Sequence, residues 1–235
     1  MRDTLFSSSI VVFISFILVA EPVYAGPYDK PALSDEEIDT RLDDLTQSLH
    51  FQQINAQYWE YGWGSFDAGT MIYSAVQVSQ DHDRKNRNTD IVQASESLIG
   101  LATVVLRPLP AFDADSVCTD PTSLRQSVWL QCLALKEALL ERSAQRANEP
   151  YELLPHLGNL GFNLLAGLIV WRVADARHAL TTAIPGEIIG EMQLWTMPKQ
   201  PMADFDQYEV QFGPLPLQTE GPVIPATGLT FTYKF

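Results

Sequence analysis

Five carboxylic acids stand inside otherwise apolar stretches of this 235-residue chain, where a buried charge is costly unless it is paired or used. They are Glu60, Asp67, Glu96, Glu187 and Glu191. Acids that are buried together shift one another's pKa values and can serve acid–base chemistry or bind a cation. The alternative is that they face solvent or pair with arginines. We take these five acids as candidate ligand-binding residues and assign no catalytic residue.

The histidines do not form a metal-binding motif. They are His50, His82, His156 and His178, and none lies three or four residues from another. A di-metal helical bundle normally carries a Glu-x-x-His motif on two of its helices, and the sequence contains no such motif. Zinc and iron sites depend on clustered histidine and cysteine. We therefore expect no metal site and no cofactor.

Nucleophilic catalysis and phosphate binding also lack a signature. The pair Gly64-Ser65 does not fit the Gly-x-Ser-x-Gly pattern of a nucleophile elbow. The glycine-rich stretches 61–69 and 157–167 lack the Lys-Ser or Lys-Thr ending of a phosphate loop. We favour a role other than catalysis.

Cys118 and Cys132 are the only cysteines, and an even number in an exported chain predicts a disulfide between them. The alternative is two separate buried thiols. If a helix began at Pro121, Cys132 would lie about 16 Å along it at 1.5 Å per residue, too far for Cys118 to double back. The bridge therefore requires a helix that starts nearer Leu124.

The N-terminus has the three-part pattern of a cleavable secretory signal. Arg2 precedes the apolar residues 5–20, and Val23-Tyr24-Ala25 places small residues before Gly26. We expect residues 1–25 to be removed and the mature protein to lie in the periplasm or elsewhere in the cell envelope. Because the first region carries a single basic residue, an uncleaved anchor in the inner membrane is the alternative.

Helical periodicity dominates the mature chain. Ser34 and Glu37 have the form of a capping box, so a helix should start there, and apolar residues recur at helical spacing towards Val78. The polar run 80–88 indicates an exposed turn. Further helices are expected at residues 90–106, from Asp120-Pro121 to about Ala147, at 153–173 and at 185–196.

Two helical pairs resemble each other. In residues 99–108 and 189–198, Ile-Gly precedes a proline at the same spacing, and a basic turn lies upstream of each. We expect an all-α fold: a bundle of two similar hairpins, 58–108 and 156–198, plus a covering helix, all within residues 26–197. Gly100 and Gly190 would mark equivalent close helix crossings.

Six prolines predict a proline-rich, irregular, extended tail over residues 198–235.

Charge excludes one class of partner. The net charge of −14 repels nucleic acid, so none is expected to bind, and no motif identifies an envelope partner or small ligand.

We interpret the chain as a soluble, exported bundle with a binding or structural role. One alternative is a four-span membrane protein, since basic residues sit in both turns, although acids interrupt three of its four spans. Another is an enzyme that uses buried carboxylates.

Overall fold

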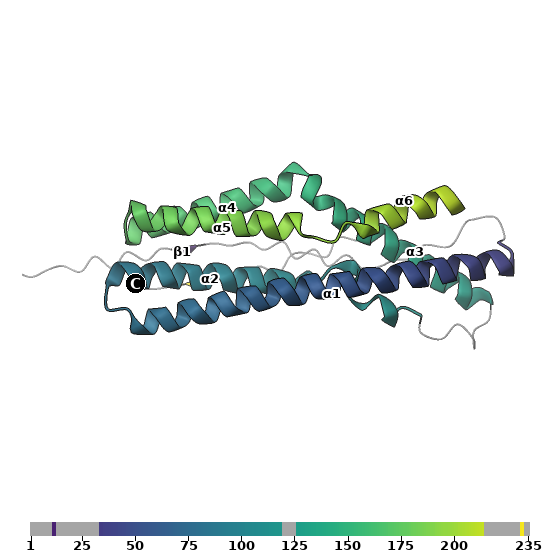
Figure 1. The fold of residues 1–235 in the computed structure, drawn as a ribbon, viewed down its shortest axis with the longest axis horizontal. Coiled ribbons are helices and arrows are strands. Elements are labelled where there is room, and N and C mark those ends of the chain that lie inside the picture. The colour runs from purple at the N-terminus through teal and green to yellow at the C-terminus, as the bar shows by residue number, and fades with distance from the viewer. Residues whose placement is uncertain (1–10, 13–32, 119–125, 214–230, 233–235) are drawn as a thin grey trace, which may run out of the picture. The chain divides into compact units, whose positions relative to one another are not determined.

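A computed structural model describes residues 11–12, 33–118, 126–213 and 231–232, and it confirms the all-α prediction (Figure 1). The helices are α1 (Asp35–Gln80), α2 (Arg84–Leu106), α3 (Gln126–Asn148), α4 (Leu153–Val173), α5 (Ala176–Trp195) and α6 (Gln200–Phe212), with 3-10 helices η1 (Pro110–Ser116) and η3 (Glu149–Tyr151). All of them belong to one unit, Ala25–Leu217. Separately, β1 (Val11–Val12) pairs antiparallel with β2 (Phe231–Thr232). The rest of the predicted signal, residues 1–10 and 13–25, lies outside the described residues.

The long first helix begins where its capping signal predicts. The Ser34 hydroxyl accepts a hydrogen bond from the Glu37 backbone N–H at 3.2 Å, which satisfies one of the exposed donors of the first turn. The helix then runs for 46 residues. The turn after it is shorter than expected, because Asp83 caps α2 by accepting from the Lys85 N–H at 3.0 Å. The polar residues 84–88 are therefore helical.

Two helices differ from their sequence-based expectations. α5 begins at Ala176 and not near Pro185, because the Asp175 side chain caps it, accepting from the His178 N–H at 3.1 Å. Pro185 lies inside the helix at the loss of one backbone hydrogen bond. The expectation of an extended tail from residue 198 is wrong for residues 200–212, which form α6. Pro201 sits in the first turn of α6, where the missing N–H would have no helical partner. Residues 214–230 lie outside the described residues.

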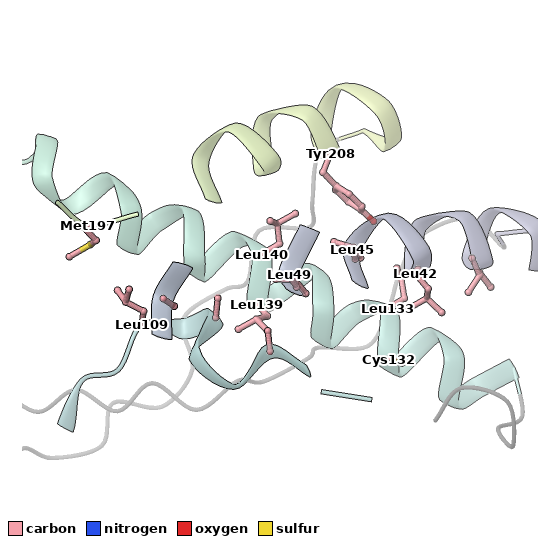
Figure 2. Packing of buried hydrophobic residues seen from close by; sticks show 14 residues of the cluster. Leu42, Leu45, Leu49, Leu109, Cys132, Leu133, Leu139, Leu140, Met197 and Tyr208 are labelled. Atoms are coloured by element: carbon pink, nitrogen blue, oxygen red, sulfur yellow. The ribbon is translucent and has the colours of Figure 1, made fainter. Parts of the chain in front are cut away.

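One end of the unit, which we call the cap, holds its hydrophobic core. The cap comprises residues 35–60 of α1 together with η1, α3 and α6. Side chains from three of these helices interlock around Leu45, Leu133 and Tyr208 (Figure 2). Leu33, Trp129 and Phe205 pack against this cluster. Burial of apolar side chains in one cluster is the usual arrangement of a domain in water.

Several of the polar groups that are buried in the cap are paired. The Tyr208 hydroxyl donates to Glu137 Oε1 at 2.5 Å, and Arg41 lies 3.5 Å from the same oxygen. The Lys136 ammonium donates to Thr46 Oγ1 at 2.8 Å, and burial lowers the pKa of this lysine. These contacts tie α3 to α1 and α6.

The cysteines lie at disulfide distance, with their Cα atoms 5.8 Å apart. The described part of α3 begins at Gln126, five residues beyond Pro121. Cys132 is therefore in the second turn of the described helix, within reach of Cys118. The Cys118 backbone has φ of 62°, in the left-handed region.

The other end of the unit, which we call the four-helix bundle, comprises residues 61–80 of α1 with α2, α4 and α5. α1 and α2 form one antiparallel hairpin, α4 and α5 form a second, and α2 packs against both helices of the second hairpin (Figure 1). The turns of the two hairpins lie at the same end. Lys85 donates to Asp175 at 3.0 Å, and the Asn88 amide donates to the Val173 carbonyl at 3.1 Å, which joins the two turns.

Apolar side chains of the bundle point outward. Among its described residues, the buried hydrophobic side chains are Val104, Ala166 and Val170. The exposed ones on α4 alone are Leu153, Leu154, Leu157, Leu160, Leu164, Leu165, Leu168 and Trp171. α1, α2 and α5 add exposed residues such as Ile72, Leu98 and Ile188. The bundle is thus apolar on the outside of all four helices.

The two glycines expected to mark equivalent crossings have similar surroundings. A Cβ atom added to Gly100 would lie 2.8 Å from Asp67 Oδ2 on α1, and one added to Gly190 would lie 2.0 Å from Asn159 Oδ1 on α4. In each hairpin, a short polar side chain of the first helix fills the space beside a glycine of the second. The duplication of the hairpins stays a prediction that this likeness favours.

Candidate functional site

The interior of the four-helix bundle is lined by polar side chains from α4. His156, Asn159 and Asn163 follow one another at three- and four-residue intervals, which places them on one face of the helix. This face is turned towards α5. It lies opposite the leucines that α4 exposes.

The outermost contact of this interior joins His156 to Glu191 of α5. Their Nδ1 and Oε2 atoms are 2.7 Å apart, and His156 Nε2 is 3.0 Å from the Pro150 carbonyl oxygen. Trp195 stacks beside the imidazole, with ring centroids 5.5 Å apart. Both partners are partly exposed, at 23% for His156 and 28% for Glu191, so this contact forms the accessible end of the polar interior.

Two asparagines continue the contacts inward. The Asn159 amide donates to Glu191 Oε1 at 3.1 Å and to the Glu187 carbonyl at 3.2 Å. The Asn163 amide donates to Asn159 Oδ1 at 2.8 Å and lies 3.3 Å from Glu187 Oε2. Because Gly186 and Gly190 carry no Cβ, both amides can approach the α5 backbone; a Cβ at Gly186 would lie 2.2 Å from Asn163 Oδ1.

Glu96 of α2 enters the same region from the opposite side. Its Oε1 atom would lie 3.9 Å from a Cβ at Gly186, beside Asn163. This oxygen is buried and has no hydrogen-bond partner among the described residues. Thr182 lies one turn before Gly186 on the same face of α5 and is 3% exposed. Its hydroxyl oxygen is also buried and has no hydrogen-bond partner among the described residues. Both groups therefore have unused bonding capacity within the described part of the chain.

The structure gathers three of the five candidate acids and leaves two elsewhere. Glu96, Glu187 and Glu191 surround the α4 amides, whereas Asp67 lies against Gly100 in the first hairpin. Glu60 belongs to the cap, where its carboxylate accepts a hydrogen bond from the Leu109 N–H. Burial raises the pKa of Glu60, and that hydrogen bond opposes the rise. The five acids therefore do not converge on one pocket.

Sequence reasoning did not include the three α4 residues among its site candidates. Their signal was present: His156, Asn159 and Asn163 are polar residues at helical spacing inside the apolar stretch Leu153–Val173. Amides carry no charge, so they stand out less than acids in an apolar stretch. An amide can nevertheless hold two carboxylates in place through its N–H donors.

A second polar group lies at the turns. His178 contacts Asp175 at 2.7 Å and Asn86 at 3.0 Å, and Asp90 follows Asn86 by one turn of α2. Hydrogen bonds from His178 and Lys85 hold the pKa of Asp175 below its usual range. Both ends of the bundle therefore carry a histidine paired with a carboxylate.

Neither end of the bundle brings a group of three metal-ligating side chains together in the part of the chain that the structure describes. A cavity in the cap, lined by residues such as Gln52, Leu109 and Ser143, has a volume of about 20 Å³, which suffices for a single water molecule. The chemistry that the arrangement supports is hydrogen bonding and proton exchange inside the bundle.

Two helical segments are long and apolar enough to cross a membrane, Arg84–Ser116 and Leu153–Val173, and in each only 22% of the most apolar window is buried. Comparison with known proteins gives no assignment: no protein-family model, no curated protein and no solved structure matches the chain.

Proposed function

We propose that the chain is an integral membrane protein whose four-helix bundle crosses the bilayer four times and anchors the acidic cap at the membrane surface. The observation that carries this proposal is the inverted polarity of the bundle. Its apolar side chains face outward and its polar side chains face inward, which is the opposite of the cap. The sequence alone favoured a soluble bundle and held the four-span protein as an alternative; the positions of the side chains favour the alternative.

The placement of charges supports the proposal. In residues 61–78, 88–106, 153–171 and 178–195 there is no lysine or arginine, and each carboxylate is buried or half-buried. Those carboxylates are Asp67, Asp90, Glu96, Glu187 and Glu191. A charge facing lipid at the centre of a helix costs roughly 2.5–3.5 kcal/mol on the insertion scale, so charges in membrane proteins face the interior of the bundle.

Helix lengths match a bilayer. α2, α4 and α5 have 23, 21 and 20 residues, about 30–35 Å at 1.5 Å per residue. The hydrocarbon layer is about 30 Å thick. Residues 61–80 of α1, the part that belongs to the bundle, form a helical segment of the same length.

The two ends of the bundle differ as membrane ends do. Aromatic side chains gather where the bundle meets the cap: Tyr61, Trp63, Tyr151 and Trp195, with Tyr151 and Trp195 in edge-to-face contact. Basic residues gather at the turns: Arg84, Lys85, Arg87, Arg172 and Arg177. Basic loops stay in the cytoplasm and aromatic rings lie at the interface, so we place the turns in the cytoplasm and the cap outside. This orientation agrees with a secretory signal and with a cysteine pair in the cap.

Lipid fits this surface better than a second copy of the chain. Exposed apolar residues occur on α1, α2, α4 and α5, represented by Ile72, Leu98, Leu164 and Ile188. A two-fold contact covers one patch on each protomer. The hydrocarbon chains of a bilayer, in contrast, cover the exposed faces of all four helices.

Flotation tests the proposal. The full chain, expressed in bacteria, should resist extraction of membranes with alkaline carbonate, and purified protein reconstituted with phospholipid should float with the vesicles on a density gradient. A chain that carbonate releases, and that stays at the bottom of the gradient without detergent, would refute membrane insertion.

A further inference from the structure

We infer that the polar interior of the bundle is a proton pathway that crosses the membrane by way of Glu96. The inference rests on the proposed function, because only a membrane-embedded bundle would have two compartments to connect. Its basis is a series of groups able to accept or release a proton, spaced along α5 from the basic turns to the aromatic end.

The series begins on α5 itself. His178, Thr182, Glu187 and Glu191 follow one another at intervals of four, five and four residues. At 1.5 Å per residue, the steps are about 6–7.5 Å along the axis, and the series covers about 20 Å. Imidazole, hydroxyl and carboxyl groups all exchange protons with hydrogen-bonded neighbours. Such chains in membrane segments mark proton relays.

Neighbouring helices complete the path at both ends. At the outer end, His156 contacts Glu191 at 2.7 Å, and both are partly exposed, so protons can enter there. At the inner end, His178 contacts Asp175 at the turn and Asn86 of α2, which lies one turn before Asp90.

The middle of the path is narrow and has unused bonding capacity. Glu187 is held by Asn163, which is 4% exposed, and Glu96 of α2 lies beside Gly186, against which the same amide packs. Glu96 Oε1 and Thr182 Oγ1 are buried with no hydrogen-bond partner among the described residues. In the pathway that we infer, these two groups carry the proton between Glu187 and His178, which lies one turn before Thr182 on α5. Glu96 is therefore the step that joins the outer half to the inner half.

Proton flux into vesicles tests the pathway. The full chain would be reconstituted into phospholipid vesicles that contain a pH-sensitive dye, and a potassium gradient with valinomycin would drive protons inward. We expect an initial flux at least tenfold higher for the wild-type protein and for Asp67→Asn than for Glu96→Gln. Asp67 is the matched control, since it is a buried carboxylate in the same bundle that lies against Gly100 instead.

Each outcome decides the inference. Wild-type flux equal to that of protein-free vesicles, or Glu96→Gln flux equal to wild type, would overturn it. If Glu96→Gln does not float with vesicles, Glu187→Gln measured against Asp67→Asn decides in its place. Wild-type protein that floats but conducts no protons refutes the pathway alone, whereas wild-type protein that does not float refutes the membrane proposal.

Discussion

Asparagine side chains fit against glycines at the centre of the second hairpin. Asn163 occupies the space beside Gly186, and Asn159 occupies the space beside Gly190. Each amide thereby reaches a carboxylate of α5. Glycine is needed at these two positions because any Cβ would lie within 2.2 Å of an amide oxygen.

Gly190→Ala should therefore destabilise the hairpin, whereas Gly161→Ala should not. A Cβ at Gly190 meets three atoms of the Asn159 amide within 2.8 Å, and we expect overpacking of about 1–3 kcal/mol. Gly161 on α4 has nothing within 4 Å, so alanine there should be neutral or stabilising by up to about 1 kcal/mol. Denaturant titrations of detergent-solubilised protein give both values. Equal effects of the two substitutions would show that the close approach is absent.

Tyr208→Phe should make the cap less sensitive to alkaline pH. Burial, and then the charge of Glu137, raises the pKa of the Tyr208 hydroxyl. Above pH 10, the usual tyrosine value, the unfolded chain loses this proton while the folded cap keeps it, so stability falls as pH rises. Below about pH 9, the substitution should cost about 1–3 kcal/mol through the lost hydrogen bond.

Denaturant titrations of both proteins from pH 7 to 11 check this. The difference between wild type and Tyr208→Phe should be constant up to about pH 9 and shrink above pH 10. A difference that stays constant to pH 11 contradicts the account.

Helices were predictable from the sequence where a local signal marks their ends. The capping box at Ser34 marks the start of α1, and Leu153–Val173 was predicted with the bounds that α4 has. α5 and α6 were missed in part because prolines were taken as helix breakers. Tertiary contacts override that tendency: the Gln52 amide donates to Asp204 of α6 at 2.8 Å, and the ring of Tyr208 is buried in the cap.

The cysteine pair should stabilise the cap by closing the segment between η1 and α3. Cys118 and Cys132 are 14 residues apart, and a loop of this length contributes about 3 kcal/mol when it is cross-linked. The double variant Cys118→Ser/Cys132→Ser should lose about 2–4 kcal/mol. Reductant should destabilise the wild type and leave the double variant unchanged. Two free thiols in aerobically purified protein, found by mass spectrometry under non-reducing conditions, would exclude the bond.

The site was predictable from the sequence only as a set of acids. Glu96, Glu187 and Glu191 were recognisable because charge stands out in an apolar stretch. Their grouping was not, since it depends on how α2 faces the second hairpin. Glu60 and Asp67 have the same sequence context but point to Leu109 and Gly100.

At the scale of the whole Ala25–Leu217 unit, two regions of opposite polarity share one helix. α1 buries Leu45 and Leu49 in the cap, and about five turns further on it exposes Ile72 and buries Asp67. The amino-acid composition does not reveal this reversal of polarity along α1. In the sequence, the acids within apolar stretches argued against membrane spans. Whether such acids face lipid or the interior depends on the direction of each helix face, which the structure provides.

The central claim is that lipid covers the apolar exterior of the bundle, and cysteine labelling tests it most directly. Single cysteines would replace Ile72, Leu98, Leu164, Ile188 and Val210 in the Cys118→Ser/Cys132→Ser protein, in phospholipid vesicles. All five side chains are exposed, at 59%, 48%, 54%, 54% and 89%, but Val210 lies on α6 in the cap.

A water-soluble maleimide should label the Val210 position at once and the other four only after detergent denaturation. A second copy of the chain could protect one or two helices, but only lipid protects one position on each of the four. If the four bundle positions are labelled as fast as the Val210 position, the bundle is in water and the account is wrong.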